Sequence, residues 1–370
     1  MTVSHIVGGA IWIQSMILVA AIVFGLFEGA LTLTGLRRRF LTRRRLGVTA
    51  IVSLALLPLV QPYLVASPYA ATLNATDVVV GQYLKGNLFI SANEMSSLLA
   101  AKTLWLEQLT TASGLLAQFI IAVFIVAFVG RAGYLVMNFR RIWQAVQAGQ
   151  LMRQTRRTRV VISPAISVPF STRGLWYYYV VLPDSMCSDC QTMQMSIGHE
   201  MQHIRQGDVD AEVILSLLSP LVVLNPGFWF LSSRMRRLGE LACDRAYLAR
   251  RGFDAHSYSM RLLNIARSTR FATQQPTAFG VPLIGRSVPF LARRSMLKDR
   301  IIEIARDQAK PTRETRLFGW GLSAVMAVLV LAGATSLAEP ADWSHERLML
   351  SSVANLERLN QLNTLAQRSW

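Results

Sequence analysis

The chain has few of the residues that form covalent or metal cross-links. Only 3 of its 370 residues are cysteines, an odd number and too few for a disulfide framework. Cys187 and Cys190 form a single C-x-x-C, and no second pair accompanies it, so we expect free thiols while a redox or metal role stays open. Cys243 is expected to be a small, buried, apolar residue.

Acidic residues are also scarce, with 21 Asp and Glu against 38 Lys and Arg and a formal charge of +17. A charge of this sign can indicate nucleic-acid binding, but here the basic residues are not gathered in one arm or finger-like module. We therefore expect no direct contact with nucleic acid. The basic residues instead follow the pattern of the apolar runs.

Long apolar runs dominate what is present, since 52% of the residues are hydrophobic and the mean hydropathy is +0.35. Residues 6–36, 46–66, 112–130 and 319–337 are each long enough to cross a bilayer. No basic residue and no small-residue cleavage site precedes the first run, so we expect it to be retained rather than removed as a signal peptide. The sequence predicts a mostly α membrane protein with four transmembrane helices and the lipid bilayer as a partner.

The charges between the runs predict which side each segment faces. Residues 37–45 contain six arginines, and residues 139–317 contain 26 basic against 13 acidic residues, so the positive-inside rule puts both in the cytoplasm. This leaves both termini and the loop 67–111 outside, as expected for a bacterial inner membrane protein. The predicted units are a three-span region 1–138, a cytoplasmic domain 139–317, a fourth span 318–338 and an extracytoplasmic tail 339–370.

Histidine is rare as well, and two of the five histidines stand four residues apart. His199, Glu200 and His203 form the pattern H-E-x-x-H. On a helix the two imidazoles project from one face and can bind zinc, while Glu200 can hold a water on the metal and act as general base of a hydrolysis. The alternative is a helix face with two solvated histidines.

A third ligand is available downstream, where Glu240 precedes Asp244 by about one helical turn. Glu240 can bind the metal, and Asp244 can accept the free N–H of a ligating histidine and so fix its tautomer. An isolated pair of this kind usually lies on a solvated helix face. Here, however, apolar residues surround the two acids.

Residues 213–231 have the composition of a further span, but a single crossing would put Glu240 on the other side of the bilayer from His199 and His203. Pro220 and the break at 225–227 instead favour two short helical pieces that lie in the interface or pack against the spans. This segment would hold the site close under the membrane.

The rest of the cytoplasmic domain is predicted to be α+β. Residues 158–183 read as short strands, and a strand leading into the zinc helix could pair with an extended substrate or simply cover the core. Residues 256–270 and 291–307 are predicted helices, and 271–290 a loop. His256 could stabilise an oxyanion, although a surface or capping role is the commoner one.

Three separate stretches resemble one known family. His-Glu-Met-Gln-His-Ile-Arg-Gln-Gly-Asp, Asn-Pro-Gly-Phe-Trp from residue 225 and Glu-Leu-Ala-Cys-Asp from residue 240 look like the membrane zinc metallopeptidases of the BlaR/MecR antirepressor type. The resemblance implies a zincin-like, gluzincin-type domain with Zn²⁺ on His199, His203 and Glu240, Glu200 as base and Asp244 behind the metal. It also implies that the large C-terminal penicillin-binding sensor domain of some members is missing here.

The predicted function is therefore a membrane-anchored zinc endopeptidase that cleaves a cytosolic or membrane-associated regulatory protein, possibly a transcriptional repressor, in antirepressor-like signal transduction. Two alternatives stay open. One is HtpX-like quality control of membrane proteins, and the other is a non-catalytic membrane receptor that retains the fold.

Overall fold

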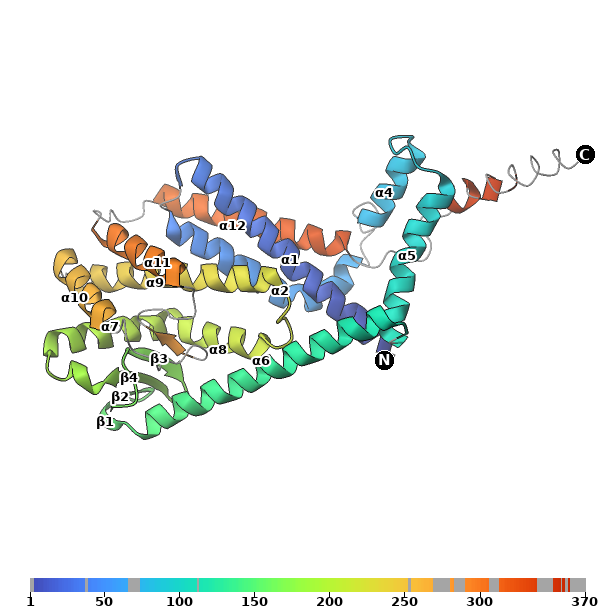
Figure 1. Cartoon of the computed structure of the whole chain (residues 1–370). Helices are drawn as coiled ribbons and strands as arrows, with labels where there is room; N and C mark the ends of the chain where they lie inside the picture. Colours follow the sequence, from blue (N-terminus) through green and yellow to red (C-terminus); the bar gives the residue numbers. More distant parts are fainter. Residues whose placement is uncertain are drawn as a thin grey trace, which may run out of the picture.

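The chain folds into a bundle of long helices joined at one end to a small sheet with shorter helices around it (Figure 1). The structure is a computed structural model, which describes residues 3–36, 39–65, 74–111, 113–251, 254–268, 280–282, 290–305, 313–337, 349–353, 355–356 and 359. In chain order the elements are α1 Val3–Leu33, α2 Phe40–Val65, α4 Ala75–Leu84, α5 Ala92–Thr111, α6 Leu115–Gln147, β1 Gln150–Gln154, β2 Thr158–Ser163, β3 Phe170–Arg173, β4 Tyr178–Pro183, a 3₁₀ turn Asp184–Met186, α7 Cys190–Gln206, α8 Asp208–Leu218, α9 Pro226–Arg251, α10 Ala255–Ser268, β5 Gly280–Pro282, α11 Phe290–Ile304 and α12 Arg313–Ser336.

Three of these helices are long and apolar enough to cross a membrane, namely α1 over 8–33, α6 over 115–147 and α12 over 317–336. They agree with three of the four predicted spans. The other predicted span, 46–66, falls largely within α2, which packs between α1, α12 and α9 but is not among these three. Four spans therefore stay a prediction, as do the sides that the loops and termini face.

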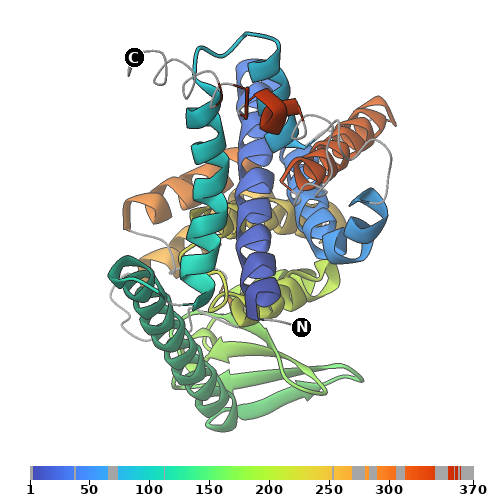
Figure 2. The same ribbon diagram turned by 90° about the vertical axis from the view of Figure 1, so that its right-hand side faces the viewer.

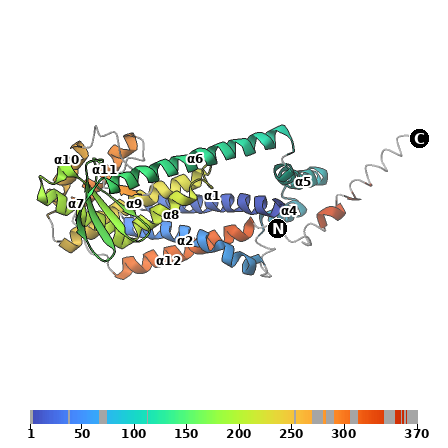
Figure 3. The same cartoon turned by 90° about the horizontal axis from the view of Figure 1, so that it is seen from below.

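The bundle core is built from helices far apart in the sequence. Buried residues of α1, α2, α9 and α12 form one apolar cluster, which includes Phe24, Leu46, Leu238 and Met326. α6 takes no part in it and runs on the other side of α1 and α9 from α2 and α12 (Figure 3). Only 6% of its most apolar 18-residue stretch is buried. The C-terminal end of α6 packs on the sheet through Leu135 and Ile142.

The sheet has the strand order β1-β2-β4-β3-β5, and all neighbours are antiparallel except β2 and β4. It lies at the end of the molecule away from α4 and α5 (Figure 1), and in the view along the bundle it lies below α1 (Figure 2). The predicted strands in 158–183 correspond to β2, β3 and β4. The strand that leads toward α7 is β4, and both of its edges are occupied, because β2 and β3 pair with it. An extended substrate could not pair with β4, so that form of the prediction is wrong.

Residues 208–251 form a helical hairpin that turns back inside the bundle. Asn225 begins the second arm: its side-chain oxygen accepts from the N–H of Gly227 at 3.0 Å, and its amide nitrogen donates to the side-chain oxygen of Gln14 in α1 at 2.7 Å. Pro226 takes the first helical position, where its missing N–H costs nothing. The two pieces expected in 213–231 are present, but the second is no short piece, since it continues unbroken as α9 to Arg251.

The first half of α9 lies alongside α1. Phe230 packs edge-on against Phe24 with 6.2 Å between ring centroids, and Arg234 reaches Glu28 at 3.2 Å. Because residue numbers rise together along the contact, the two helices run parallel. Arg131 of α6 reaches the hairpin tip from the other side, where it donates to Ser219 at 2.8 Å.

Candidate metal centre

The helix that carries H-E-x-x-H is fixed at both ends. Asp189 caps α7 by accepting from the backbone N–H groups of Gln191 and Thr192, each at 3.1 Å. Gly207 ends it with φ of 75°, a left-handed conformation that glycine adopts without strain. Along its length one apolar face packs on the sheet through Met201 and Ile204, which leaves the histidine face to α9.

A glycine lets α9 approach that face closely. A Cβ atom at residue 198 would lie 2.3 Å from a ring carbon of Tyr247 in α9, which is too close for two carbon atoms. Tyr247 is itself buried. The absence of a side chain at 198 therefore permits the separation of α7 and α9 that the site needs.

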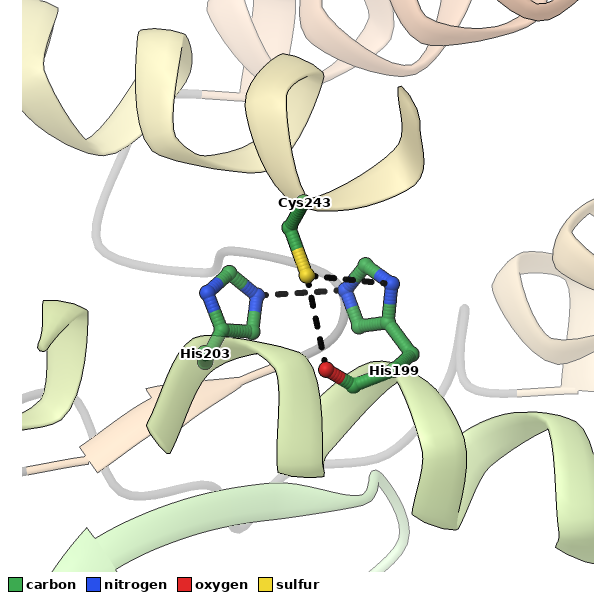
Figure 4. Close-up of side chains that lie close together, drawn as sticks. All are labelled: His199, His203 and Cys243. Carbon is green, nitrogen blue, oxygen red and sulfur yellow. Dashed lines mark hydrogen bonds between the residues drawn. The ribbon is translucent and has the colours of Figure 1, made fainter. Parts of the chain in front are cut away.

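The two histidines of α7 and the first acid of α9 converge as predicted. The Nε2 atoms of His199 and His203 lie 3.1 Å apart, and the carboxylate oxygens of Glu240 approach these atoms at 3.7 and 3.5 Å. All three side chains are buried. Figure 4 shows the two imidazoles on neighbouring turns of α7, facing the helix above them.

The other ring nitrogens decide which way the lone pairs point. Nδ1 of His203 lies 2.9 Å from a carboxylate oxygen of Asp208, which accepts when ionised. Nδ1 of His199 lies 3.0 Å from the hydroxyl of Tyr258, and that hydroxyl donates to Asp244 at 2.7 Å. Both Nδ1 atoms therefore carry the proton, and both Nε2 lone pairs point at the same spot.

This donor set fits a tetrahedral cation such as zinc. Donor atoms at about 2.0 Å from a tetrahedral ion are about 3.3 Å from each other, close to the three distances above. Without a cation, two lone pairs and a carboxylate would repel each other in a space closed to water. We infer that a metal ion could be held by His199, His203 and Glu240.

Cys243 offers a second candidate for the third ligand. Ligand atoms of His199, His203 and Cys243 all lie within 4.8 Å of one another. Yet the thiol is 3.4 Å from the backbone oxygen of His199, to which it donates (Figure 4). Burial raises the pKa of the Cys243 thiol well above its ordinary value, and the charges of Asp244 and Glu240 add to the shift. We retain Glu240 as the candidate third ligand, because its carboxylate oxygens approach both Nε2 atoms, at 3.7 and 3.5 Å, whereas the thiol already donates to a backbone oxygen.

Glu200 lies on the same helix and is fully buried. Neither carboxylate oxygen has a hydrogen bond of ordinary geometry among the residues that the structure describes, although the backbone and hydroxyl of Ser171 are close enough to lower its pKa. Burial outweighs Ser171 and raises the pKa of Glu200 well above its ordinary value. A buried carboxyl group so weakly paired is costly, which makes Glu200 a candidate for a chemical role.

Three members of the site were not foreseen from the sequence. Asp208 begins α8 and belongs to the HEMQHIRQGD stretch, but nothing in its spacing tells that it reaches back to His203. Tyr258 of α10 contacts His199 and Asp244. Arg300 of α11 donates to both oxygens of Asp244, each at 2.7 Å, and lies 2.8 Å from an oxygen of Glu240. Their sequence distance from the motifs hides them.

Burial and the guanidinium groups set the charges of the site. Burial lowers the pKa of His199 to about 3, so its imidazole is neutral at neutral pH and its lone pair is available to a metal. For Asp244, burial by itself raises the pKa, but Arg300 more than compensates and the net pKa is lowered. For Asp208, burial also raises the pKa, but His203 and Arg44 outweigh it and the net pKa is lowered.

The other candidate residues lie outside this cluster. His256 is exposed in the first turn of α10, where its backbone N–H donates to the cap Asp254 at 3.2 Å. Cys187 and Cys190 are exposed free thiols at the start of α7. Most of the predicted loop 271–290 lies outside the described residues; of the rest, 280–282 form β5, beside β3, and residue 290 begins α11.

Comparison with known proteins agrees with this arrangement. The chain matches a family described as BlaR1 peptidase M56 over residues 10–304, which include the bundle helices α1 and α2, the sheet, the hairpin and α11. No curated protein matches the chain. The match covers well over half of the sequence, and the M56 peptidases are membrane metallopeptidases. The chain therefore belongs to the BlaR1 peptidase M56 family.

Proposed function

We propose that the protein is a zinc-dependent endopeptidase that cleaves a regulatory protein at the cytoplasmic face of the membrane. The observation that carries the proposal is the convergence of two histidine Nε2 atoms, 3.1 Å apart, with the carboxylate of Glu240. Two imidazoles and a carboxylate are the ligands of catalytic zinc in gluzincin-type peptidases, and they leave one position open.

The roles of the chain's own residues follow from their surroundings. Zinc held by His199, His203 and Glu240 would polarise a peptide carbonyl and acidify a water. Glu200 would take a proton from the attacking water and pass it to the leaving amine, and burial, which raises the pKa of Glu200 above its ordinary value, favours its acting as a base. Asp208 and Asp244 keep the histidines in the tautomer whose Nε2 is free.

The cytoplasmic side is inferred from charge. The site lies between α7 and α9, and the arginines of residues 39–45 lie at the same end of the bundle, where Arg44 pairs with Asp208 and Arg43 with Glu28. Arginine-rich segments of this kind stay in the cytoplasm. The substrate class, a repressor or another regulator of signalling, is carried over from the family resemblance.

A Glu200→Gln variant tests the proposal. Removing the general base should lower cleavage by about 10²- to 10⁴-fold, while the metal content stays equal to that of the parent. Quantitative proteomics of cells that carry either form would identify substrates as proteins whose fragments vanish in the variant. Asp184→Asn, the same carboxylate-to-amide change at an exposed residue of the domain, is the matched control. Fragments that persist in Glu200→Gln cells would contradict this mechanism.

One observation favours a second function, quality control of membrane proteins. The hairpin tip is apolar and exposed, with Leu217, Leu218, Leu221 and Leu224 each at least 47% accessible, and it lies against the membrane helix α1. A substrate embedded in the bilayer could reach the site along this hairpin. Cleavage of membrane-inserted reporters but not of soluble proteins would favour this alternative. A non-catalytic receptor is disfavoured because all five predicted site residues are present together.

A further inference from the structure

Each of the two candidate zinc histidines lies beside a carboxylate, and each carboxylate forms an ion pair with an arginine from another part of the fold. His203 contacts Asp208, which pairs with Arg44 of α2. His199 reaches Asp244 through the Tyr258 hydroxyl, with its Nδ1 atom 3.4 Å from Oδ1 of Asp244, and Asp244 pairs with Arg300 of α11. Both chains of contact run from a histidine to a carboxylate to a guanidinium, with a hydroxyl between the first two groups of the second chain, and they share no residue.

Arg300 makes the fuller set of contacts. Its Nε and Nη2 atoms donate to separate oxygens of Asp244, and its Nη1 atom lies 2.8 Å from the Oε2 atom of Glu240. The residue is 2% exposed. One planar guanidinium thus hydrogen-bonds both oxygens of Asp244 and forms an ion pair with the proposed third ligand.

Arg44 acts on the other histidine from a more open position. Its guanidinium pairs with Oδ1 of Asp208, while Oδ2 of the same carboxylate faces Nδ1 of His203 at 2.9 Å. About a fifth of the Arg44 side chain is exposed. We therefore expect solvent to replace part of this contact when Arg44 is removed, and the effect to be smaller than at Arg300.

A buried carboxylate without a cation beside it can turn toward other donors, and such a turn alters the hydrogen bond to the histidine. An arginine prevents the turn, because its donors have a fixed geometry. Mutation of a residue that hydrogen-bonds a metal-binding histidine typically lowers metal affinity by about 10- to 100-fold. The two arginines are therefore placed to set how well His199, His203 and Glu240 hold a metal.

We propose that Arg300 and Arg44 are positioning residues of the metal centre, which hold the Asp244–His199 and Asp208–His203 pairs, and Glu240, in the arrangement that binds the metal. The inference rests on the proposed function for the identity of the ligands. Neither arginine belongs to the two helices that carry those ligands, so the site is complete only when α2 and α11 are docked against it.

The test compares Arg300→Met with Arg237→Met in the full-length protein, purified in detergent. Arg237 also joins α9 to α11, through an ion pair with Asp299, but no contact of Arg237 with Glu240 or Asp244 is among those described. Zinc affinity is measured by competition with a chromophoric chelator. The visible absorption spectrum of the cobalt-substituted protein reports ligand geometry, which a loss of packing elsewhere would not change.

Arg300→Met should weaken zinc binding by about 10- to 100-fold and shift the cobalt spectrum, and Arg44→Met should do the same to a smaller extent. Arg300→Lys, which keeps the charge but loses the fork, should lie between parent and Arg300→Met. Arg237→Met should match the parent within about twofold. If Arg300→Met does not fold, the double variant with Asp244→Asn removes both buried charges together and should fold but retain the weakened binding.

Equal affinity and an unchanged spectrum in Arg300→Met would overturn the inference, and so would an equal loss in Arg237→Met, which would trace the effect to helix docking. A parent protein that binds neither zinc nor cobalt would overturn the inference and the zinc assignment together. Cleavage is not among these readouts. Failure of the peptidase proposal, seen as cleavage that survives Glu200→Gln, is therefore distinguishable from failure of this inference.

Discussion

The two halves of α9 pack against different surroundings and are stabilised by different interactions. Its first half, from Pro226, packs along α1 mainly through apolar and small residues such as Gly227 and Phe230. Its second half carries Glu240 and Asp244, both buried, and each is paired with Arg300. One continuous helix thus passes from a membrane-helix contact into a charged core. Apolar contacts dominate the first, with one ion pair between Arg234 and Glu28, whereas the two buried acids of the second are both paired with a guanidinium.

The largest effect is expected at the metal end of α9. Glu240→Gln should reduce bound zinc from one equivalent to a small fraction, because an amide is a much weaker ligand than a carboxylate. Cys243→Ala should leave the zinc content unchanged, since its thiol donates to the backbone oxygen of His199 while Glu240 faces both Nε2 atoms. Metal analysis of the purified variants decides between the two. Zinc loss in Cys243→Ala alone would reverse the assignment of the third ligand.

A smaller effect, on stability, is expected where the two halves meet. Glu28 of α1 is 5% exposed and pairs with Arg43 and Arg234, so Glu28→Gln removes a buried anion that two arginines share. Removing one member of a fully buried pair costs about 3 kcal/mol or more; because the Arg234 side chain is 35% exposed, we expect the free energy of unfolding in detergent to fall by less, about 1–3 kcal/mol. Glu107→Gln in α5, an exposed carboxylate, is the control. A stable Glu28→Gln protein would contradict a structural role for this pair.

The apolar half of α9 should respond to volume rather than to charge. A Cβ atom at Gly227 would lie 3.0 Å from the Cβ of Ala21 and 3.1 Å from the backbone oxygen of Ile17. We expect Gly227→Val to lower the free energy of unfolding by about 1–3 kcal/mol. Gly29→Val in α1, where nothing lies within 4 Å, controls for the helix propensity of valine. Equal losses in both variants would mean that α9 does not pack this closely on α1.

The smallest effects are expected at the candidates that lie outside the cluster. His256→Ala, Cys187→Ser and Cys190→Ser change exposed side chains, so stability should stay within about 0.5 kcal/mol of the parent. Cleavage rates should also be retained. A large loss of activity in His256→Ala would restore the oxyanion role that the sequence left open. An oxidant-dependent change in the cleavage rate of the parent that is absent from the Cys187→Ser/Cys190→Ser double variant would point to a redox function.

The candidate ligands of the site were predictable because they stand in short sequence patterns with helical spacing. His199 and His203 share a helix face whenever their segment is helical, and the Asp189 cap and Gly207 make it helical. Glu240 and Asp244 stand one turn apart for the same reason. The break at Asn225 and Pro226 was readable too, since both residues begin helices. The length of the helix that follows was not, because its stability comes from contacts with α1 and α11.

By itself the sequence determined the metal-binding residue types, their helical spacing and the apolar runs, since these depend on local periodicity and composition. Only the tertiary structure decided which distant groups complete the site. Arg44, Tyr258 and Arg300 reach Asp208, Asp244 and His199 from three other helices, and nothing local marks them. The physical reason is that carboxylates buried between two helices must find their counter-charges in whatever packs against them, and packing is a property of the whole fold.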